Sequence, residues 1–375
     1  MNPPGPHNRR GPRPLWLHLM MAQQTAPDWP GVWRSWSSGS PNWSGPGWIG
    51  AEAADPALIA GIAAYRRHPY QRAVTEPAAI WTEGGSRLLD YGGVGPPVLF
   101  VPSLVNRAHV LDLAADNSML RFLAQGGVRP LLLDWGWPDE AARGFTLTDY
   151  VAGRLERAIV AVGAPVVLAG YCMGGLMALA AAGRRPELVT RLALLATPWD
   201  FWAGDAAASA SRRLGAMLPI LEPALALGTL PVDALQILFS LLEPGAVPAK
   251  YREFGGLDQG SARARRFVAI EDWLNDGVPL AAPVAREVIG GWYGGNTPLA
   301  GTWRIAGLPV GVPRVPSFLA IPARDRIVPP GSAAALAGLL HDPVVVRPQA
   351  GHVGMVAGSG AKARLWEALL AWMRA

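Results

Sequence analysis

The stretch that decides the fold is Gly170-Tyr171-Cys172-Met173-Gly174-Gly175. The apolar residues 164–169 before it contain a β-branched pair and predict a buried strand. The residues 176–182 after it are strong helix formers, and Gly183 closes the run. A strand, a tight turn with glycines at both ends and a helix together form a nucleophile elbow, here with a cysteine as the nucleophile.

Steric crowding explains the glycines of this turn. The nucleophile must project from a sharp, strained turn at the strand tip, and side chains at Gly170 and Gly174 would collide there. The N–H groups at the start of the next helix then point toward the sulfur and favour a thiolate. The residues alone leave one alternative open, which is a buried structural cysteine beside a glycine turn.

Composition limits the class of protein. The chain has 375 residues, half of them hydrophobic, which suffices for one large α/β domain with an insertion or for two small domains. Its single cysteine allows no internal disulfide and indicates a reducing compartment, so we expect a cytoplasmic protein. We expect no nucleic-acid partner and no membrane span, because the sequence has neither a dense basic stripe nor an apolar run of about 18 residues.

Residues 1–50 differ from the rest of the chain. They contain nine prolines and six of the sixteen tryptophans. With this spacing, the segment shows neither the hydrophobic periodicity of a helix nor that of a strand. We expect a poorly ordered Pro/Trp-rich leader that partly packs on the domain. The alternative is adhesion of its tryptophans to an apolar surface or a partner subunit. These tryptophans are Trp16, Trp29, Trp33, Trp36, Trp43 and Trp48.

Strand and helix patterns alternate along much of the remaining chain. The patterns predict strands at residues 87–91, 97–101, 129–133, 191–196, 317–321 and 343–346, and helices at residues 110–124, 148–162 and 361–374. This alternation predicts an α/β fold with a mostly parallel, doubly wound sheet. Residues 201–310 break it with helical and loop-like sequence, and we interpret them as an inserted, mainly helical cap. The sheet core would then comprise residues 51–200 and 311–375.

Two further residues are expected beside Cys172. Ligands gather at the carboxyl ends of parallel strands, and Asp325 and His352 each follow a predicted strand within six residues. Glycines flank His352, so we expect a freely bending loop there. The chain order of nucleophile, acid and histidine is that of the α/β-hydrolase fold. The alternatives are a turn-capping role for Asp325 and an ordinary loop histidine at His352.

The roles of these residues follow from proton chemistry. A free thiol has a pKa near 8.5, so His352 is expected to take its proton while Asp325 holds the imidazole in the required tautomer. The backbone N–H of Met173 is expected to stabilise the oxyanion. A second donor is expected from the loop after residue 101, at Leu104 or Val105, with Asn106 beside them. No sequence pattern of a metal or nucleotide site is present.

Five motifs together resemble the polyhydroxyalkanoate synthase family, the branch of the α/β-hydrolase fold with a thiol nucleophile. They span roughly residues 85–375 in the family's order. The motifs are Leu104-Val105-Asn106-Arg107, Asp134-Trp135-Gly136-Trp137-Pro138-Asp139, the elbow stretch, Ala323-Arg324-Asp325-Arg326-Ile327-Val328-Pro329-Pro330 and Gly351-His352-Val353-Gly354. Arg326 stands where these synthases usually carry a histidine. The short chain looks most like the smaller synthases, some of which work with a second subunit.

The resemblance implies an acyltransferase that polymerises 3-hydroxyacyl-CoA through an acyl-cysteine, with CoA thioester as substrate and no cofactor. It also implies contact with a polyester granule surface and with a second synthase subunit or another copy of the chain. Two rival functions stay open. One is a cysteine hydrolase that cleaves thioesters, polyesters or lactones with the same triad. The other is a non-catalytic granule protein.

Overall fold

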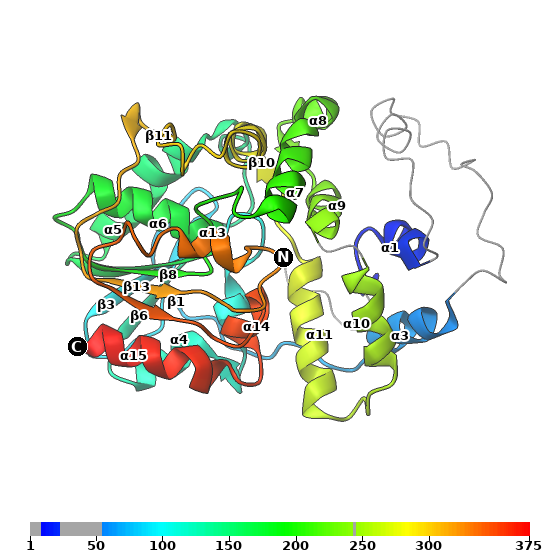
Figure 1. Ribbon diagram of the computed structural model, residues 1–375. Helices are drawn as coiled ribbons and strands as arrows, with labels where there is room; N and C mark the ends of the chain where they lie inside the picture. The colour runs from blue at the N-terminus through cyan, green and yellow to red at the C-terminus, as the bar shows by residue number, and fades with distance from the viewer. Residues whose placement is uncertain (1–8, 23–54, 243–244) are drawn as a thin grey trace.

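Figure 1 shows the computed structural model of the chain, which describes residues 9–22, 55–242 and 245–375. Its centre is an eight-stranded sheet with the strand order β1-β2-β6-β3-β7-β8-β13-β14. The strands are β1 Ala78–Glu83, β2 Ser86–Asp90, β3 Pro97–Val101, β6 Arg129–Asp134, β7 Val166–Tyr171, β8 Val189–Leu195, β13 Ser317–Ala320 and β14 Pro343–Val346. The β1–β2 and β2–β6 pairs are antiparallel and the other pairs are parallel, which confirms the expected mostly parallel sheet.

The central strands are buried on both faces. All six residues of β7 are buried, and alternate residues enter different hydrophobic clusters. Val166 and Leu168 join one cluster, whereas Val167 and Ala169 join the other. This pattern explains why the sequence before the elbow is continuously apolar rather than alternating.

Helices cover both faces of the sheet. One face carries η5 (Asp149–Leu155), α5 (Glu156–Ala161) and α6 (Met173–Arg184), and the other carries α4 (Met119–Gln125), η7 (Lys362–Trp366) and α15 (Glu367–Arg374). Figure 1 shows α5 and α6 on the side of the sheet opposite α4 and α15. The expected helices at residues 148–162 and 361–374 are therefore confirmed, and the sheet is doubly wound.

The helix expected at residues 110–124 is wrong for its first half. The chain there forms a short 3-10 turn, η3 (Ala108–Leu111), and a small hairpin of β4 (Asp112–Ala114) and β5 (Asn117–Ser118). Asp112 is buried and accepts hydrogen bonds from Tyr91 and Arg121, and the Ser118 hydroxyl caps α4 by accepting from the Arg121 N–H. These bonds start the helix at Met119 instead.

The chain between β8 and β13 is mainly helical, as expected for residues 201–310, and we call these residues the cap. Its helices are α7 Asp205–Ala216, α8 Leu218–Leu225, α9 Val232–Leu242, α10 Ala246–Gly255, α11 Ala262–Asn275, α12 Ala282–Arg286 and the π-helix η6 Glu287–Gly294. Short strand pairs, β9 (Thr229–Leu230) with β10 (Leu280–Ala281) and β11 (Arg304–Ile305) with β12 (Leu308–Pro309), connect them. Figure 1 shows α7 to α11 gathered at one side of the sheet.

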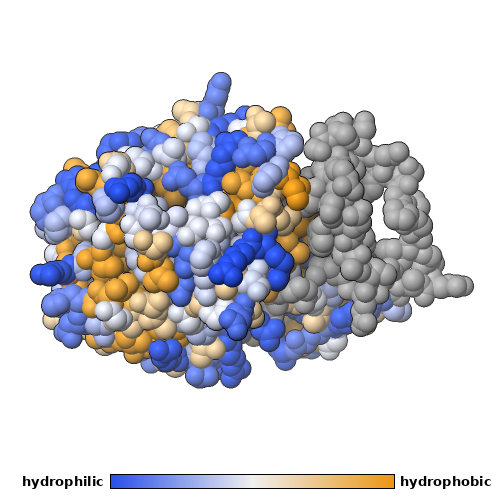
Figure 2. All heavy atoms as spheres, turned by 45° about the horizontal axis from the view of Figure 1, so that its top comes forward, coloured by the Kyte–Doolittle hydropathy of each residue, from blue (hydrophilic) through white to orange (hydrophobic). Residues whose placement is uncertain are grey.

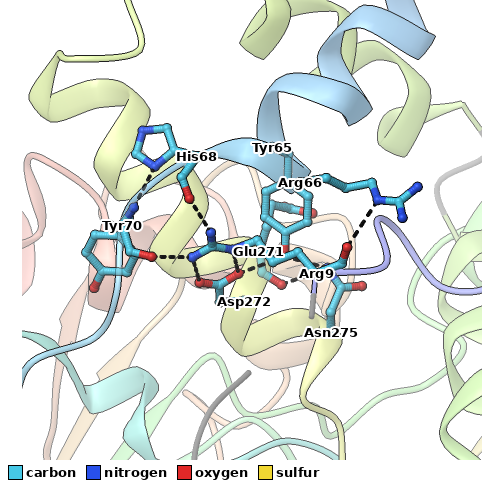
Figure 3. A network of polar contacts seen from close by, with 8 residues as sticks. All are labelled: Arg9, Tyr65, Arg66, His68, Tyr70, Glu271, Asp272 and Asn275. Carbon is cyan, nitrogen blue, oxygen red and sulfur yellow. Dashed lines mark hydrogen bonds and ion pairs between the residues drawn. The ribbon is translucent and has the colours of Figure 1, made fainter. Parts of the chain in front are cut away.

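Residues 9–22, which are part of the expected leader, are folded against the cap. Figure 3 shows the Arg9 guanidinium between α11 and the segment that follows α3 (Pro56–Arg67). It donates to both Asp272 carboxylate oxygens at 2.6 and 2.7 Å, and to the carbonyl oxygens of His68 and Tyr70, each at 2.5 Å. The helix α1 (Leu15–Ala22) follows, and Leu17 is fully buried. Residues 1–8 and 23–54, with five of the six leader tryptophans, lie outside the described residues.

Removal of the Arg9 guanidinium is expected to destabilise the protein. Its side chain is 1% exposed, so Arg9→Met would remove the charged partner of Asp272, which would keep only the Tyr65 hydroxyl of its donors, and the Arg9 donor of two carbonyl oxygens. Breaking such a buried pair costs about 3 kcal/mol or more of the free energy of unfolding. Urea denaturation measures this loss, and the exposed neighbour Arg10→Met is the control. Equal stability of the two variants would contradict the structural role of Arg9.

On the face drawn in Figure 2, hydrophobic residues are interspersed with hydrophilic ones. Over the described ranges, no helix combines the length and the apolar character needed to cross a bilayer.

Candidate active site

Cys172 lies between strand β7 and helix α6 in a strained backbone conformation. Its φ is 57° and its ψ is −129°, in a region that residues with a side chain rarely adopt. Its N–H donates to the Leu195 carbonyl at 2.9 Å, and its carbonyl accepts from the Gly175 N–H at 2.9 Å. These bonds fix the turn at both ends, and such strain persists only where the surroundings enforce it.

The three glycines of the elbow lie in close contact with neighbouring atoms. A Cβ at Gly170 would lie 2.4 Å from the Gly175 Cα, and one at Gly174 would lie 2.1 Å from the Val101 carbonyl oxygen. A Cβ at Gly175 would lie 1.8 Å from Thr197 Oγ1. The sequence argument anticipated the crowding at Gly170 and Gly174, and the structure adds that β3 and the segment after β8 cause much of it.

Asp325 and His352 form a buried pair. The distance between His352 Nδ1 and Asp325 Oδ2 is 2.6 Å. The other carboxylate oxygen of Asp325 accepts from the N–H groups of Ile327 and Val328, both at 2.9 Å. Because both oxygens are engaged, the carboxylate is fixed in orientation and His352 Nε2 stays available for the sulfur.

His352 is not on a free loop, contrary to the sequence expectation. It is the first residue of the short helix α14 (His352–Ala357), which follows Gly351. The Tyr171 hydroxyl donates to its carbonyl oxygen at 3.3 Å, and the two rings lie 5.1 Å apart. Tyr171 was missed as a site residue, although it precedes Cys172, because its contact with residue 352 depends on the folded sheet.

The groups around His352 shift the pKa of its imidazole. Burial lowers the pKa of its imidazole, but the charges of Cys172 and Asp325 and hydrogen bonds to both raise it, and together they bring the pKa to about 10. The protonated imidazole is therefore stabilised between the sulfur and the carboxylate. His352 and Cys172 line the same cavity, so the imidazole lies beside the candidate nucleophile.

This raised pKa predicts a pH dependence of stability. A histidine pKa is near 6.5 in the unfolded chain and about 10 here, so proton binding favours the folded state. The contribution is fully present below pH 6.5 and is lost as the pH rises through about 10. We expect the free energy of unfolding to fall from pH 7 to pH 10, and to fall less in His352→Gln. Parallel curves in urea titrations of the two proteins would contradict this assignment.

The four residues expected around the oxyanion have different positions. Met173 and Val105 line a cavity that contains Cys172, whereas the Leu104 side chain is buried in the core. The Val105 N–H has only a long contact, at 3.4 Å, with Ser103 Oγ. Asn106 lines a second cavity, and its buried Nδ2 has no hydrogen-bond partner among the described residues. This arrangement favours Met173 and Val105 over Leu104 as donors.

Cys172 lies where two small apolar cavities meet. The first, of about 80 Å³, is walled largely by the cap. The second, of about 90 Å³, contains His352 and is closed by residues of α9 and α11. Both walls are mainly hydrophobic, so a group carried on the sulfur would be shielded from water.

The chain is similar to known proteins over most of its length. The family model described as alpha/beta hydrolase fold matches residues 147–358, which include Cys172, Asp325 and His352. The poly(3-hydroxyalkanoate) polymerase subunit PhaC of Allochromatium vinosum is 29% identical over 290 residues, 74% of this chain and 80% of that protein. The subunit of the same name from Haloferax mediterranei is 28% identical over 316 residues, 80% of this chain and 63% of that protein.

A solved structure supports the fold independently. The esterase from Exiguobacterium antarcticum superposes with a TM-score of 0.51 at 15% identity, over 80% of this chain and 100% of that one. The family model and the sheet order indicate the same fold. The chain belongs to the α/β-hydrolase fold family, and it is similar in sequence to the poly(3-hydroxyalkanoate) polymerase subunits named above.

Proposed function

We propose that this protein is an acyltransferase that polymerises 3-hydroxyacyl-CoA, with release of CoA, through an acyl group carried on Cys172. The observation that carries the proposal is the buried Asp325–His352 pair, 2.6 Å apart, whose histidine lines one cavity together with a cysteine at φ 57°. The relatives named as poly(3-hydroxyalkanoate) polymerase subunits support the choice of substrate.

The first half of the reaction transfers the acyl group to the protein. His352 takes the proton of Cys172, and the thiolate attacks the carbonyl carbon of the CoA thioester. The carbon–sulfur bond to CoA breaks, and CoA leaves as a thiol with the proton from His352. Thiol replaces thiol, so this exchange is nearly balanced in energy. The N–H groups of Met173 and Val105 are the proposed donors to the oxyanion.

The second half forms the ester. His352 takes the proton of the 3-hydroxyl of another acyl unit, and the resulting oxygen nucleophile attacks the acyl-cysteine carbonyl. The bond to Cys172 breaks, and the sulfur leaves as a thiolate that recovers a proton from His352. Asp325 holds the imidazole in one orientation through both steps and stabilises its charge.

The same residues would serve a hydrolase, and access of water decides between the two reactions. Water at the acyl-cysteine would yield a free hydroxy acid, whereas the apolar walls of both cavities favour transfer to a hydroxyl of the substrate. Cavity polarity therefore supports the synthase over the thioesterase, polyesterase or lactonase alternatives.

The experiment that tests the proposal measures CoA release from 3-hydroxybutyryl-CoA beside the recovered product. Insoluble polyester with stoichiometric CoA supports the synthase, and free 3-hydroxybutyrate with the same CoA yield supports a hydrolase. Cys172→Ser and His352→Gln are the controls, since both change the proposed chemistry at a single side chain. No CoA release under any condition would contradict both.

The proposal also covers the location and the partners of the protein. A polymerase of this kind would work in the cytoplasm at the surface of its polyester granule, without a cofactor. A second synthase subunit or another copy of this chain would be its partner. Sedimentation of the purified chain with and without substrate tests the self-association.

A further inference from the structure

The apolar cavity at Cys172 has an unusual polar group in its wall. Most of its lining is aliphatic or aromatic, and Ser103 Oγ already accepts from the Val105 N–H. Tyr293 contributes a second hydroxyl from the π-helix η6. Tyr293 also lines the adjoining cavity of about 490 Å³, which contains Asp325 and Arg326, and it is one of several residues shared by the two walls.

The Tyr293 hydroxyl makes no hydrogen bond within the part of the chain that the structure describes. Burial and then the charge of Cys172 raise the pKa of this phenol, so it stays protonated at neutral pH and acts as a donor. The side chain is half-buried, so its hydroxyl is available to a ligand in the cavity. Because Tyr293 and Cys172 line the same cavity, such a ligand would lie beside the reacting sulfur.

Several contacts hold Tyr293 in place. Its carbonyl oxygen accepts from Trp202 Nε1 at 2.9 Å, and its ring packs edge-on against Phe201 with centroids 5.0 Å apart. The next residue, Gly294, packs so tightly on α7 that a Cβ at Gly215 would lie 2.4 Å from its Cα.

The residues that follow complete this support. Asn296 Nδ2 donates to Asp200 at 2.9 Å, and Asn296 Oδ1 accepts from the Phe201 N–H at 2.9 Å. The cap and the segment after β8 thus fix the backbone around Tyr293 from both sides. A π-helical turn at such a position is typical of functional sites.

We propose that the Tyr293 hydroxyl donates a hydrogen bond to the C3 oxygen of the acyl group carried on Cys172, and so selects 3-oxygenated acyl chains. This inference rests on the proposed function. The C3 oxygen lies four bonds from the sulfur, and it is a hydroxyl oxygen in the first acyl unit and an ester oxygen in the growing chain. The phenol can donate to either, whereas a plain acyl chain would leave it unpaired in an apolar cavity.

The test compares two thioesters in single-turnover acylation, measured by CoA release. Both 3-hydroxybutyryl-CoA and butyryl-CoA can acylate Cys172, but only the first has a C3 oxygen. We expect the wild type to favour the hydroxyacyl substrate and Tyr293→Phe to reduce that preference by about fivefold to tenfold, the effect of one hydrogen bond. A merely structural role of Tyr293 would lower the amount of folded protein and slow both reactions equally. The ratio of the two acylation rates is insensitive to such a loss.

A matched control removes another buried phenol. Tyr150 packs edge-on against Trp135 in the core on the α5 and α6 side of the sheet, and Tyr150→Phe should leave the ratio unchanged. A wild-type ratio near one, or an unchanged ratio in Tyr293→Phe, would overturn the inference alone. Equal slowing of both substrates by Tyr293→Phe would also overturn it, because it would place the phenol at the carbonyl. A wild type that releases CoA from neither thioester would overturn the proposed function, and this inference with it.

Discussion

Replacement of Cys172 by alanine is expected to lower the rate of CoA release from 3-hydroxybutyryl-CoA by roughly 10⁴- to 10⁶-fold, the loss seen when a nucleophile is removed from a triad. The variant should keep its fold, because Cys172 is partly exposed to the cavities and a smaller side chain fits the same φ of 57°. The Asp325–His352 bond does not involve the sulfur and should persist. Stopped-flow detection of free thiol measures the loss.

A serine variant tests the same prediction more closely. Cys172→Ser retains a nucleophile of similar size, but a hydroxyl is far harder to deprotonate than a thiol. We therefore expect residual activity above that of Cys172→Ala and well below that of the wild type. Unchanged CoA release in Cys172→Ala would show that the thiol is not the nucleophile. That result would favour the non-catalytic granule protein, especially if attachment to polyester granules were also unchanged.

The second large effect is expected at Gly174. A Cβ added there would lie 2.1 Å from the Val101 carbonyl oxygen and 2.5 Å from that of Pro102. Both oxygens belong to the backbone at the end of β3, which cannot move without disturbing the centre of the sheet. Gly174→Ala should therefore cost about 3 kcal/mol or more of the free energy of unfolding. It should also displace Cys172 and abolish acylation.

Gly144→Ala is the matched control for that substitution. A Cβ at Gly144 would meet no atom within 4 Å, and its φ is negative, so the added methyl group causes no strain. Urea denaturation of the two variants measures the difference. Gly174→Ala with wild-type stability would contradict the tight approach of α6 to the end of β3, and with it the steric explanation of the elbow.

The elbow and the parallel sheet were predictable because their signals are local. The glycine spacing of the elbow and the apolar run of β7 are visible in adjacent residues, and burial on both faces is common to all parallel sheets, although the backbone that crowds Gly174 belongs to β3. The positions of Asp325 and His352 followed from one general rule, that the carboxyl ends of parallel strands meet at one edge. Their spacing of one helix and one strand brings both to that edge.

Features that depend on contacts between distant segments were not predictable. The helix expected at residues 110–124 starts late because Asp112 is held by Tyr91 and Arg121, and neither contact shows in a local pattern. Residues 9–22 fold because Arg9 meets Asp272, 263 positions later. Composition alone suggested disorder for this segment, since it does not reveal a buried partner of a single arginine.

Tyr293 is the clearest example of this limit. Its segment, residues 287–294, carries glycines and aromatic residues without a catalytic motif, so the sequence analysis treated it as part of the cap. Its importance appears only where η6 packs on α7 and on the segment that follows β8. Substrate selection by a cap residue therefore has to be argued from the folded chain.

The most direct test of the central claim is mass spectrometry of the protein after rapid acid quenching with isotopically labelled 3-hydroxybutyryl-CoA. We predict a labelled acyl adduct on the peptide that contains Cys172, formed at the rate of the first CoA release and absent from Cys172→Ala. Release of CoA by the wild type with the label on another residue, or with no adduct at any quench time, would contradict the account.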